Sequence, residues 1–307
     1  MSWRLEVKVS GTTYTVEFKP LGVAVIYSKT SLLRLIGISV LLASELLDKL
    51  KAYAERSNDS CVFQNVIPGL LEAYYGLSSE CVERIVLSGY GYSLRLGRAP
   101  GGATVVEASY PLELCDEGVR GELSESEELF SLEYTTSQYI PATRIALSSL
   151  LALGLQSPST LMLLRDYDPI TSRYVLTVIS RLREALDRGV KLLVELGYEV
   201  QVEDFDSERL VVVLRESRGR RVSLWDLPAW VNQVLGLAVF LDENPSTLIV
   251  EEPFTLLSIE QARRLAEHLW RARSKTMIIL SSSMEAVELL KDLEAREPRG
   301  LAIHQLY

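Results

Sequence analysis

An α/β fold is predicted by three features of the sequence. Three short apolar runs without a polar break are typical of strands buried on both faces of a parallel sheet: Leu21–Tyr27, Leu248–Val250 and Met277–Leu280. Segments with helical spacing of apolar residues lie between them, for example Ile259–Arg273. Two carboxylates, Glu251 and Glu252, follow the second run. Because ligands of open α/β sheets bind beyond the carboxyl ends of the strands, we expect a site there.

The composition is that of an ordinary globular protein. The 307 residues are 48% hydrophobic and 24% charged, and the net charge of -9 does not favour nucleic acid or anionic membranes. Cys61, Cys81 and Cys115 are odd in number and have no metal-ligand spacing, which indicates reduced thiols and a cytoplasmic protein. The uncharged stretch Ile145–Leu164 is interrupted by polar residues 156–160, so we expect two short buried segments and no membrane span. The excess of arginine over lysine weakly favours a thermophilic source.

The first half of the chain is predicted to be mostly β. Leu5–Val9 and Thr13–Phe18 flank Ser10-Gly11, which is typical of a hairpin. Further elements are expected as a helix at Val66–Tyr75, strands at Val82–Val86 and Tyr92–Leu96, a turn at Arg98–Ala103, and a compact apolar turn at Tyr139–Arg144.

The second half is predicted to alternate between helices and strands. Ile170–Leu196 has helical spacing throughout and is expected to be one long helix, with Gly197 at its C-terminal end. Further elements are expected as strands at Tyr198–Val202 and Leu210–Leu214, helices at Ala229–Leu241 and Glu285–Leu293, and an edge strand at Leu301–Leu306.

A second candidate site follows the first buried run. The tetrapeptide Ser28-Lys29-Thr30-Ser31 leads directly into an apolar helix that continues to about Tyr53. A strand, a Lys-Thr-Ser sequence and a helix form the frame of a phosphate-binding loop, in which glycines let backbone N–H groups surround the phosphates. Here a single serine stands between Tyr27 and Lys29, and the glycines are absent.

The order of these parts resembles the ATPase heads of the ABC type, in the P-loop NTPase branch that includes SMC-like, DNA-repair and overcoming-lysogenization-defect ATPases. Lys29–Ile36 is similar to the end of the Walker A motif and its helix, and Tyr139–Arg144 to a Tyr-Ile-Pro-Ala-Glu-Arg segment of the family. Leu248–Pro253 is similar to the Walker B strand, and Met277–Ser283 to the strand that carries the switch histidine. The resemblance covers nearly the whole chain.

This resemblance implies one head over residues 1–307, with a mixed sheet, flanking helices and a short helical insert in place of a long coiled coil. The N-terminal lobe would span about 1–144, the insert about 145–196 and the C-terminal lobe about 197–307. If nucleotide binds, the resemblance implies that Lys29, Thr30 and Ser31 contact the phosphates. Thr30 and Glu251 would then hold Mg²⁺, while Glu252, paired with Glu251, polarises a water.

The sequence departs from the family where the chemistry takes place. The glycines before Lys29 are missing, and the Ser-Ser-Gly signature corresponds to Pro228-Ala229-Trp230. The switch histidine corresponds to Ser282, which cannot replace imidazole as a strong phosphate contact. The family's Glu-x-His-Leu-His segment after Glu252 corresponds to Phe254–Ser258. Because these four elements differ together, we predict a pseudo-ATPase with no cofactor, with a surviving ATP and Mg²⁺ site as the alternative.

Three functions follow as hypotheses. In the first, the head is a structural or regulatory subunit that forms a homodimer, or a heterodimer with an intact ATPase head, through Trp230 and Trp225; buried packing of these side chains is the alternative. In the second, it is an atypical ATPase linked to DNA maintenance that uses Lys29, Thr30 and the acidic pair. In the third, the chain contacts nucleic acid through Arg218–Arg221; the alternative is that these arginines belong to a solvated hairpin.

Three other residues were considered as site candidates. His268 and His304 have no nucleophile or metal ligands nearby in the sequence, and surface or structural roles are expected for both. Arg144 is expected to form a structural ion pair or to contact a nucleotide.

Overall fold

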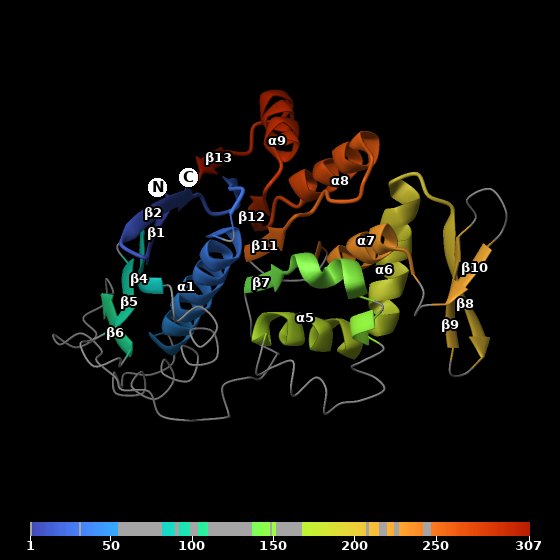
Figure 1. The fold of residues 1–307 in the computed structure, drawn as a ribbon, viewed down its shortest axis with the longest axis horizontal. Coiled ribbons are helices and arrows are strands. Elements are labelled where there is room, and N and C mark those ends of the chain that lie inside the picture. The colour runs from blue at the N-terminus through green and yellow to red at the C-terminus, as the bar shows by residue number, and fades with distance from the viewer. Residues whose placement is uncertain are drawn as a thin grey trace.

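The computed structural model describes residues 2–30, 32–54, 82–89, 92–98, 104–109, 137–147, 149–151, 168–206, 209–214, 220–223, 227–241 and 247–307 (Figure 1). Its centre is a parallel five-stranded sheet with the order β13-β3-β12-β11-β7. The strands are β3 (Val23–Tyr27), β7 (Ser137–Ile140), β11 (Thr247–Glu251), β12 (Thr276–Ser281) and β13 (Leu301–Gln305). The three predicted buried runs are therefore adjacent strands, and β13 is an edge strand as expected.

The two faces of this sheet pack into two different hydrophobic cores. Alternate residues of β12 show the division: Met277 and Ile279 belong to one core, and Ile278 and Leu280 to the other. Helix α1 (Leu32–Ala54) packs in the second core, while α7 (Ala229–Leu241), α8 (Ile259–Arg271) and α9 (Met284–Arg296) pack in the first. Because both faces are covered, the strands are continuous apolar runs.

An antiparallel sheet covers the other side of α1 (Figure 1). It has the order β2-β1-β4-β5-β6. Its strands are β1 (Trp3–Val9), β2 (Thr12–Phe18), β4 (Val82–Gly89), β5 (Tyr92–Arg98) and β6 (Thr104–Ser109). The predicted hairpin is confirmed, and Ser10 and Gly11 at its turn have positive φ angles of 47° and 84°. Strand β6 was not predicted.

A third sheet lies at the opposite end of the molecule, beside α6 (Figure 1). It contains β8 (Val200–Asp206), β9 (Arg209–Leu214) and β10 (Arg220–Ser223), in antiparallel order β10-β9-β8. The strands predicted at Tyr198–Val202 and Leu210–Leu214 are confirmed, and the first one runs further than expected.

The prediction of one long helix at Ile170–Leu196 is wrong. The segment forms α5 (Pro169–Ser180) and α6 (Leu182–Glu195). Arg181 separates them because its φ of -131° and ψ of 29° are not helical. Gly197 does end α6: its φ is 97°, and the amide of Tyr198 reaches back to Leu193 O at 2.9 Å.

Tyr139–Arg144 is more structured than the predicted turn. It contains the end of β7 and most of the 3-10 helix η4 (Ala142–Ala146). The helix predicted at Val66–Tyr75, the turn at 98–103 beyond β5, and most of Ile145–Leu164 lie outside the described residues. Among the residues that are described, no helix has the length and apolar character needed to cross a membrane.

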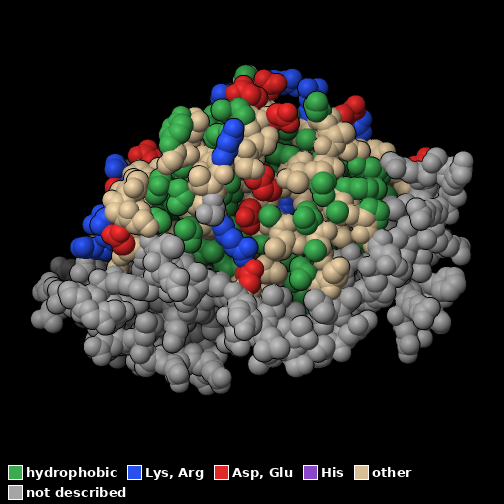
Figure 2. Space-filling model, viewed as in Figure 1, with side chains coloured by type: hydrophobic (Ala, Val, Ile, Leu, Met, Phe, Trp, Pro, Cys, Tyr) green, Lys and Arg blue, Asp and Glu red, His purple; other side chains and the backbone are tan. Residues whose placement is uncertain are grey.

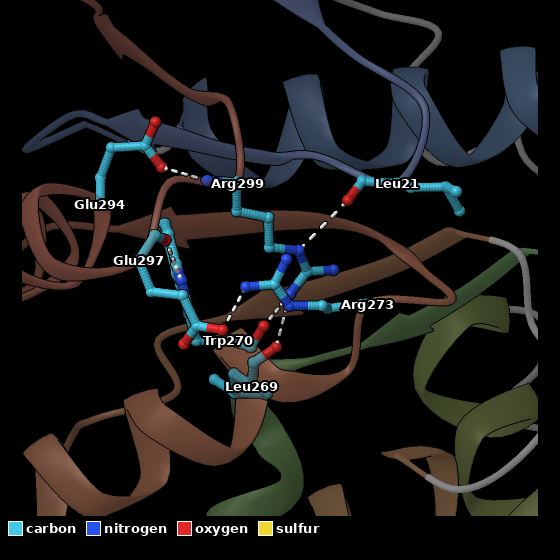
Figure 3. A network of polar contacts seen from close by, with 7 residues as sticks. All are labelled: Leu21, Leu269, Trp270, Arg273, Glu294, Glu297 and Arg299. Atoms are coloured by element: carbon cyan, nitrogen blue, oxygen red, sulfur yellow. Dashed lines mark hydrogen bonds and ion pairs between the residues drawn. The ribbon is translucent and has the colours of Figure 1, made fainter.

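Arg299 joins the segments at the amino ends of the strands (Figure 3). All five of its side-chain N–H groups donate to backbone carbonyls, which belong to Leu21, Leu269, Trp270, Ala272 and Lys275, at 2.6 to 3.1 Å. Burial lowers the pKa of Arg299 to about 10, and the nearby Arg273 acts in the same sense. The guanidinium thereby caps the end of α8 and holds the turns that precede β3 and β12.

Candidate functional site

A pocket of about 680 Å³ opens at the carboxyl edge of the parallel sheet. It is lined by Lys29, Thr30, Leu33, Arg34, Leu35, Ile38, Asp168, Glu251, Glu252 and Ser282. Acidic and basic side chains lie next to each other near the middle of this face, among hydrophobic and neutral atoms (Figure 2). The fold therefore brings together four site residues that the sequence singled out, although more than 200 residues separate Lys29 and Thr30 from the acidic pair.

The connection between β3 and α1 is short and internally bonded. Residues 28–31 separate the two elements, and Ser31 lies outside the described residues. The amide of Ser28 donates to Ser281 O at 3.2 Å, the amide of Thr30 to Ser28 Oγ at 3.3 Å, and the amide of Leu32 to Thr30 Oγ1 at 3.4 Å. Two amides of this connection and the first amide of α1 thus already donate within the chain.

Lys29 and Thr30 are both exposed at the mouth of the pocket. The hydroxyl of Thr30 lies 2.8 Å from that of Ser28, which is fully buried. Within the described part of the chain, the Lys29 ammonium has no hydrogen bond or ion pair. It is therefore a free positive charge beside the two carboxylates.

Glu251 is bonded to the segment that follows β7. Its Oε2 accepts hydrogen bonds from the hydroxyl of Tyr139 at 3.2 Å and from the amide of Ala142 at 3.0 Å. Tyr139 is almost wholly buried, and this burial, together with the Glu251 charge, raises the pKa of its hydroxyl well above the ordinary value. The phenol therefore remains a proton donor to Glu251 at neutral pH.

Glu252 is bonded to the segment that follows β12. Its Oε1 accepts the amide of Ser282 at 2.6 Å, and its Oε2 accepts the hydroxyl of Ser281 at 3.2 Å. Its backbone has a positive φ of 49°, a conformation that non-glycine residues seldom adopt. Among the described residues, no group of three His, Cys, Asp or Glu side chains is placed to hold a metal ion.

Arg144 lies beneath the acidic pair and is fully buried. Its guanidinium donates to the carbonyl oxygens of Pro141, Glu251 and Glu252, so it holds the backbone of the turn and not the carboxylates. Burial lowers its pKa to about 10, whereas the nearby carboxylates act in the opposite sense. Of the two expected roles, a nucleotide contact is not tested, and among the described residues Arg144 bonds to carbonyl groups and forms no ion pair.

Gln233 of α7 supports the same turn. Its side-chain amide donates to Glu252 O at 2.7 Å and to Pro253 O at 3.0 Å. Two buried atoms of these side chains, Arg144 Nε and Gln233 Oε1, have no hydrogen-bond partner among the described residues. Sequence reasoning did not identify Gln233, because a buried glutamine in an otherwise apolar helix gives no spacing signal.

Arg34 and Asp168 form an ion pair across the pocket at 2.6 Å. Burial alone would lower the pKa of Arg34, but the contact with the Asp168 carboxylate outweighs it and raises the pKa. Asp168 is also the N-cap of α5, where it accepts the amide of Thr171 at 3.0 Å. The pair was not predicted; the Asp-Pro sequence before α5 indicates a helix start, but nothing in the sequence indicates its partner.

Comparison with solved structures identifies the architecture. A crystal structure of an Smc head bound to the C-terminal winged-helix domain of ScpA superimposes with a TM-score of 0.52 and 13% identity, covering 93% of this chain and 90% of that one. The fold is that of an SMC head.

Two further SMC heads are similar at lower scores. A head with an extended coiled coil from Pyrococcus furiosus, bound to the C-terminal domain of ScpA, has a TM-score of 0.48 and 12% identity, covering 93% of this chain and 90% of its own. The head from Thermotoga maritima has a TM-score of 0.45 and 12% identity, covering 94% and 91%. No protein-family model matches the sequence, and no curated protein matches it.

The segment compared with the signature of ABC-type heads lies at the start of α7. Pro228 O accepts the amides of Val231 and Asn232, so these residues begin the helix. Trp230 is half-buried and its ring stacks on that of Tyr198, with centroids 4.3 Å apart and an interplanar angle of 18°. Part of Trp230 is thus used within the chain, while Trp225 lies outside the described residues.

The two histidines lie outside this pocket. His268 of α8 contacts Glu195 of α6 at 3.2 Å. His304 Nε2 lies 2.7 Å from the backbone oxygen of Glu17 and connects the edge strands β13 and β2. Both contacts join elements of the fold, as expected for structural residues.

Proposed function

We propose that this chain is an SMC-like head without ATPase activity, which acts as a structural or regulatory subunit by pairing with an identical chain or with an intact head. One observation carries the proposal: the connection between β3 and α1 has only four residues, and the amides of Ser28, Thr30 and Leu32 already donate within the chain. We further propose that residues 1–307 form a single head with the lobes given above.

The phosphates of ATP need several backbone donors around them. Among the described residues, the amides of Ser28, Thr30 and Leu32 already donate within the chain and the Thr30 hydroxyl is bonded to Ser28, so few donors of this connection are left to surround a phosphate. Lys29 would supply a point charge without the geometry that positions a γ-phosphate. These contacts support a head that does not need ATP or Mg²⁺.

Hydrolysis is the direct test. We expect the purified chain to release phosphate from ATP no faster than its Glu252→Gln and Lys29→Ala variants. We also expect ATP with Mg²⁺ to leave the melting temperature unchanged, because a ligand stabilises a protein only by occupying its native state. A melting shift of several degrees at millimolar nucleotide, abolished by Lys29→Ala, would contradict this proposal.

Pairing through the region of Trp230 and Trp225 is the second part of the proposal. Trp230 remains partly exposed in spite of its stacking on Tyr198. An aromatic anchor at an interface is worth about 2 kcal/mol or more, which is enough to hold a pair without ATP. The solved Smc head is itself bound to a domain of another protein, which supports a role for this fold as an interaction module.

Native mass measurement and light scattering test the pairing. We expect a dimer, or a complex with an intact head, that weakens in Trp230→Ala. Tyr307→Ala is the matched control, because Tyr307 is 88% exposed and follows the edge strand β13. A wild-type chain that stays monomeric with ATP and with candidate heads would contradict pairing.

An atypical ATPase is the second candidate, and the pocket favours it. The pocket joins Lys29, whose ammonium is free in the described structure, to the carboxylates of Glu251 and Glu252. Turnover that requires both Lys29 and Glu252 would support this function. Binding to DNA, through arginines such as Arg220 and Arg221 of β10, is testable by the salt dependence of retention on a duplex.

A further inference from the structure

The pocket at the carboxyl edge of the sheet contains charges of both signs that do not meet. Lys29 lines it together with Glu251 and Glu252, yet within the part of the chain that the structure describes its ammonium forms no ion pair with either carboxylate. Opposite charges that share a pocket without neutralising each other keep their capacity to bind a ligand. The two signs also lie on different segments, since Lys29 follows β3 and the carboxylates follow β11.

The acidic side of the pocket has unused hydrogen-bond acceptors. Both bonds to Glu251 go to Oε2, so its Oε1 has no partner among the described residues. Each carboxylate oxygen of Glu252 accepts one hydrogen bond, and a carboxylate oxygen can accept a second. Both side chains are half-buried, which fixes their position. Acceptors of this kind suit an ammonium group, which has three donors.

The basic side has unused donors. Arg34 contacts Asp168 through Nη2 alone, so its Nε and Nη1 have no partner in the described part of the chain. The ammonium of Lys29 adds three more donors at the mouth of the same pocket. Charge-assisted hydrogen bonds from a guanidinium or an ammonium to a carboxylate are among the strong ones. An anionic group such as a carboxylate therefore suits this side.

The remaining wall of the pocket is largely apolar. Leu33, Leu35 and Ile38 of α1 line it, and Leu33 and Ile38 are otherwise buried. Methylene groups of a ligand gain free energy when they leave water for such a wall. The pocket volume of about 680 Å³ leaves room for an aliphatic chain between two charged ends.

We propose that this pocket binds a small zwitterionic aminocarboxylate. Its ammonium group is held by Glu251 and Glu252, its carboxylate by Lys29 and Arg34, and its aliphatic part by the apolar side chains of α1. A nucleotide matches this arrangement less well, because it has no ammonium group for the acidic pair. The site needs neither ATP hydrolysis nor pairing, so it goes beyond the function proposed above and does not depend on it.

NMR titration of the full chain with compounds of defined charge tests the site. The probes are glycine, 4-aminobutanoate and 6-aminohexanoate, which differ in the spacing of their charges, with hexylamine and hexanoate as single-charge controls. The amide of Ser282, bonded to Glu252, reports on the acidic side, and that of Thr171, bonded to Asp168, reports on the Arg34 side. We expect 6-aminohexanoate to shift both amides and to bind about tenfold more tightly than either control, since each end makes bonds to charged groups.

Substitution of Lys29 separates the two ends of the ligand. Lys29→Ala should reduce the affinity for 6-aminohexanoate to that for hexylamine, and Lys29→Arg should preserve the preference for the zwitterion. Lys291→Ala is the matched control, because it removes a lysine of α9 that is bonded to Glu288, and it should change nothing. Lys29 is exposed, so these variants should fold.

Two results would overturn the site. If no aminocarboxylate binds more tightly than hexylamine and hexanoate, or if Lys29→Ala binds 6-aminohexanoate as the wild type does, the pocket does not recognise zwitterions, and the proposed function is left intact. If ATP with Mg²⁺ displaces 6-aminohexanoate, the pocket is a nucleotide site. That result would contradict this inference and the ATP-independent head proposed above together.

Discussion

Two arginines contact the opposite ends of the parallel sheet, and they differ in how many of their side-chain donors are paired with carbonyl oxygens. Arg299 lies at the amino ends of the strands and donates all five of its N–H groups to carbonyl oxygens (Figure 3). Arg144 lies at the carboxyl ends and donates to three carbonyls, and its buried Nε has no partner among the residues that the structure describes. Burial lowers the pKa of each to about 10, yet both keep their charge at neutral pH.

This difference separates a purely structural end of the sheet from a candidate functional end. At the Arg299 end the side-chain donors are matched to carbonyls, as stability requires. At the Arg144 end two buried polar atoms have no partner in the described part of the chain, Glu252 has a positive φ, and the open pocket is lined by Lys29, for which the same part of the chain provides no bond. A buried unmatched donor costs free energy, so its persistence indicates that this edge is not shaped by stability alone.

Removal of Arg299 should have the largest effect on stability. Arg299→Ala leaves five carbonyls without their common donor, although solvent can reach some of them because the side chain is half-buried. We expect a loss of about 4 kcal/mol in the free energy of unfolding, measured by urea denaturation. Arg296→Ala is the control, because Arg296 is exposed on the last turn of α9. An equal loss in both variants would show that the Arg299 contacts are not what holds this end.

A methyl group added at Gly37 should have the next largest effect on stability, and it would act at the carboxyl end of the parallel sheet. A Cβ at this position would lie 2.4 Å from Leu280 Cδ1 and 2.7 Å from Tyr139 Cε2. We expect Gly37→Ala to cost about 1–3 kcal/mol in spite of the better helix propensity of alanine. The Tyr139 ring must shift, so its contact with Glu251 should weaken as well.

Gly97→Ala provides the comparison for this experiment, since a Cβ there would meet no atom closer than 3.9 Å. Urea denaturation of both variants measures the difference. A Gly37→Ala protein as stable as Gly97→Ala would mean that α1 can move away from the sheet without cost.

The central sheet was predictable because its signal is local. Residues of β3, β11 and β12 are apolar without interruption, since both faces of the sheet are covered, and such runs are recognisable in the sequence alone. Strand β7 was missed because its four residues, Ser137–Ile140, are too few to show a pattern. The break at Arg181 was missed because the apolar spacing of α5 continues into α6.

The candidate site was predictable only as a list of residues. Lys29 and the acidic pair follow buried strands, and a shared sheet edge places them in one pocket. Their bonding could not be predicted, because Ser282, Tyr139 and Asp168 contact Glu252, Glu251 and Arg34 from segments whose distance in sequence carries no pairing signal. Arg299 gave no signal at all, since a single arginine after a helix is common on any protein surface.

Alkaline pH should destabilise the fold through two buried tyrosines. Burial raises the pKa of Tyr139 and of Tyr174, whose hydroxyl donates to Gly236 O at 3.0 Å. In the unfolded chain both ionise near pH 10, so above about pH 10 the unfolded state loses protons that the folded state keeps. The stability that these groups contribute is complete below pH 10 and is lost as the pH rises towards their folded pKa values.

Urea midpoints between pH 8 and pH 11 measure this effect. The decline should be shallower in Tyr139→Phe and in Tyr174→Phe than in the wild type. Tyr307→Phe, at an exposed position, should retain the wild-type decline. A decline that is the same in all four proteins would assign alkaline unfolding to other groups.

The smallest effect on stability is expected for the contacts of Glu83, which are exposed to solvent. Glu83 of β4 contacts Lys8 of β1 and accepts the amide of Gly11 at 2.6 Å, which ties the β1–β2 turn to the neighbouring strand. The hydrogen bond from Lys8, followed by that from Gly11, lowers the pKa of Glu83. Since the folded pKa is depressed, the contribution to stability is present above the unfolded pKa and is lost as the pH falls through the folded one.

An NMR titration of the Glu83 carboxyl should show this lowered pKa, and Lys8→Ala should move it back towards the ordinary value. Salt should also move the Glu83 pKa back towards the ordinary value, because exposed charges are screened, whereas the bonds from Arg144 and Arg299 to carbonyl groups should be insensitive to salt. Lys291→Ala is the matched control, as it removes an exposed ion pair with Glu288 elsewhere in the chain. A Glu83 pKa that does not respond to Lys8→Ala would show that the backbone amide of Gly11 is the main cause of the lowered pKa. Glu83 would then act chiefly through a bond to the main chain, as Arg144 and Arg299 do.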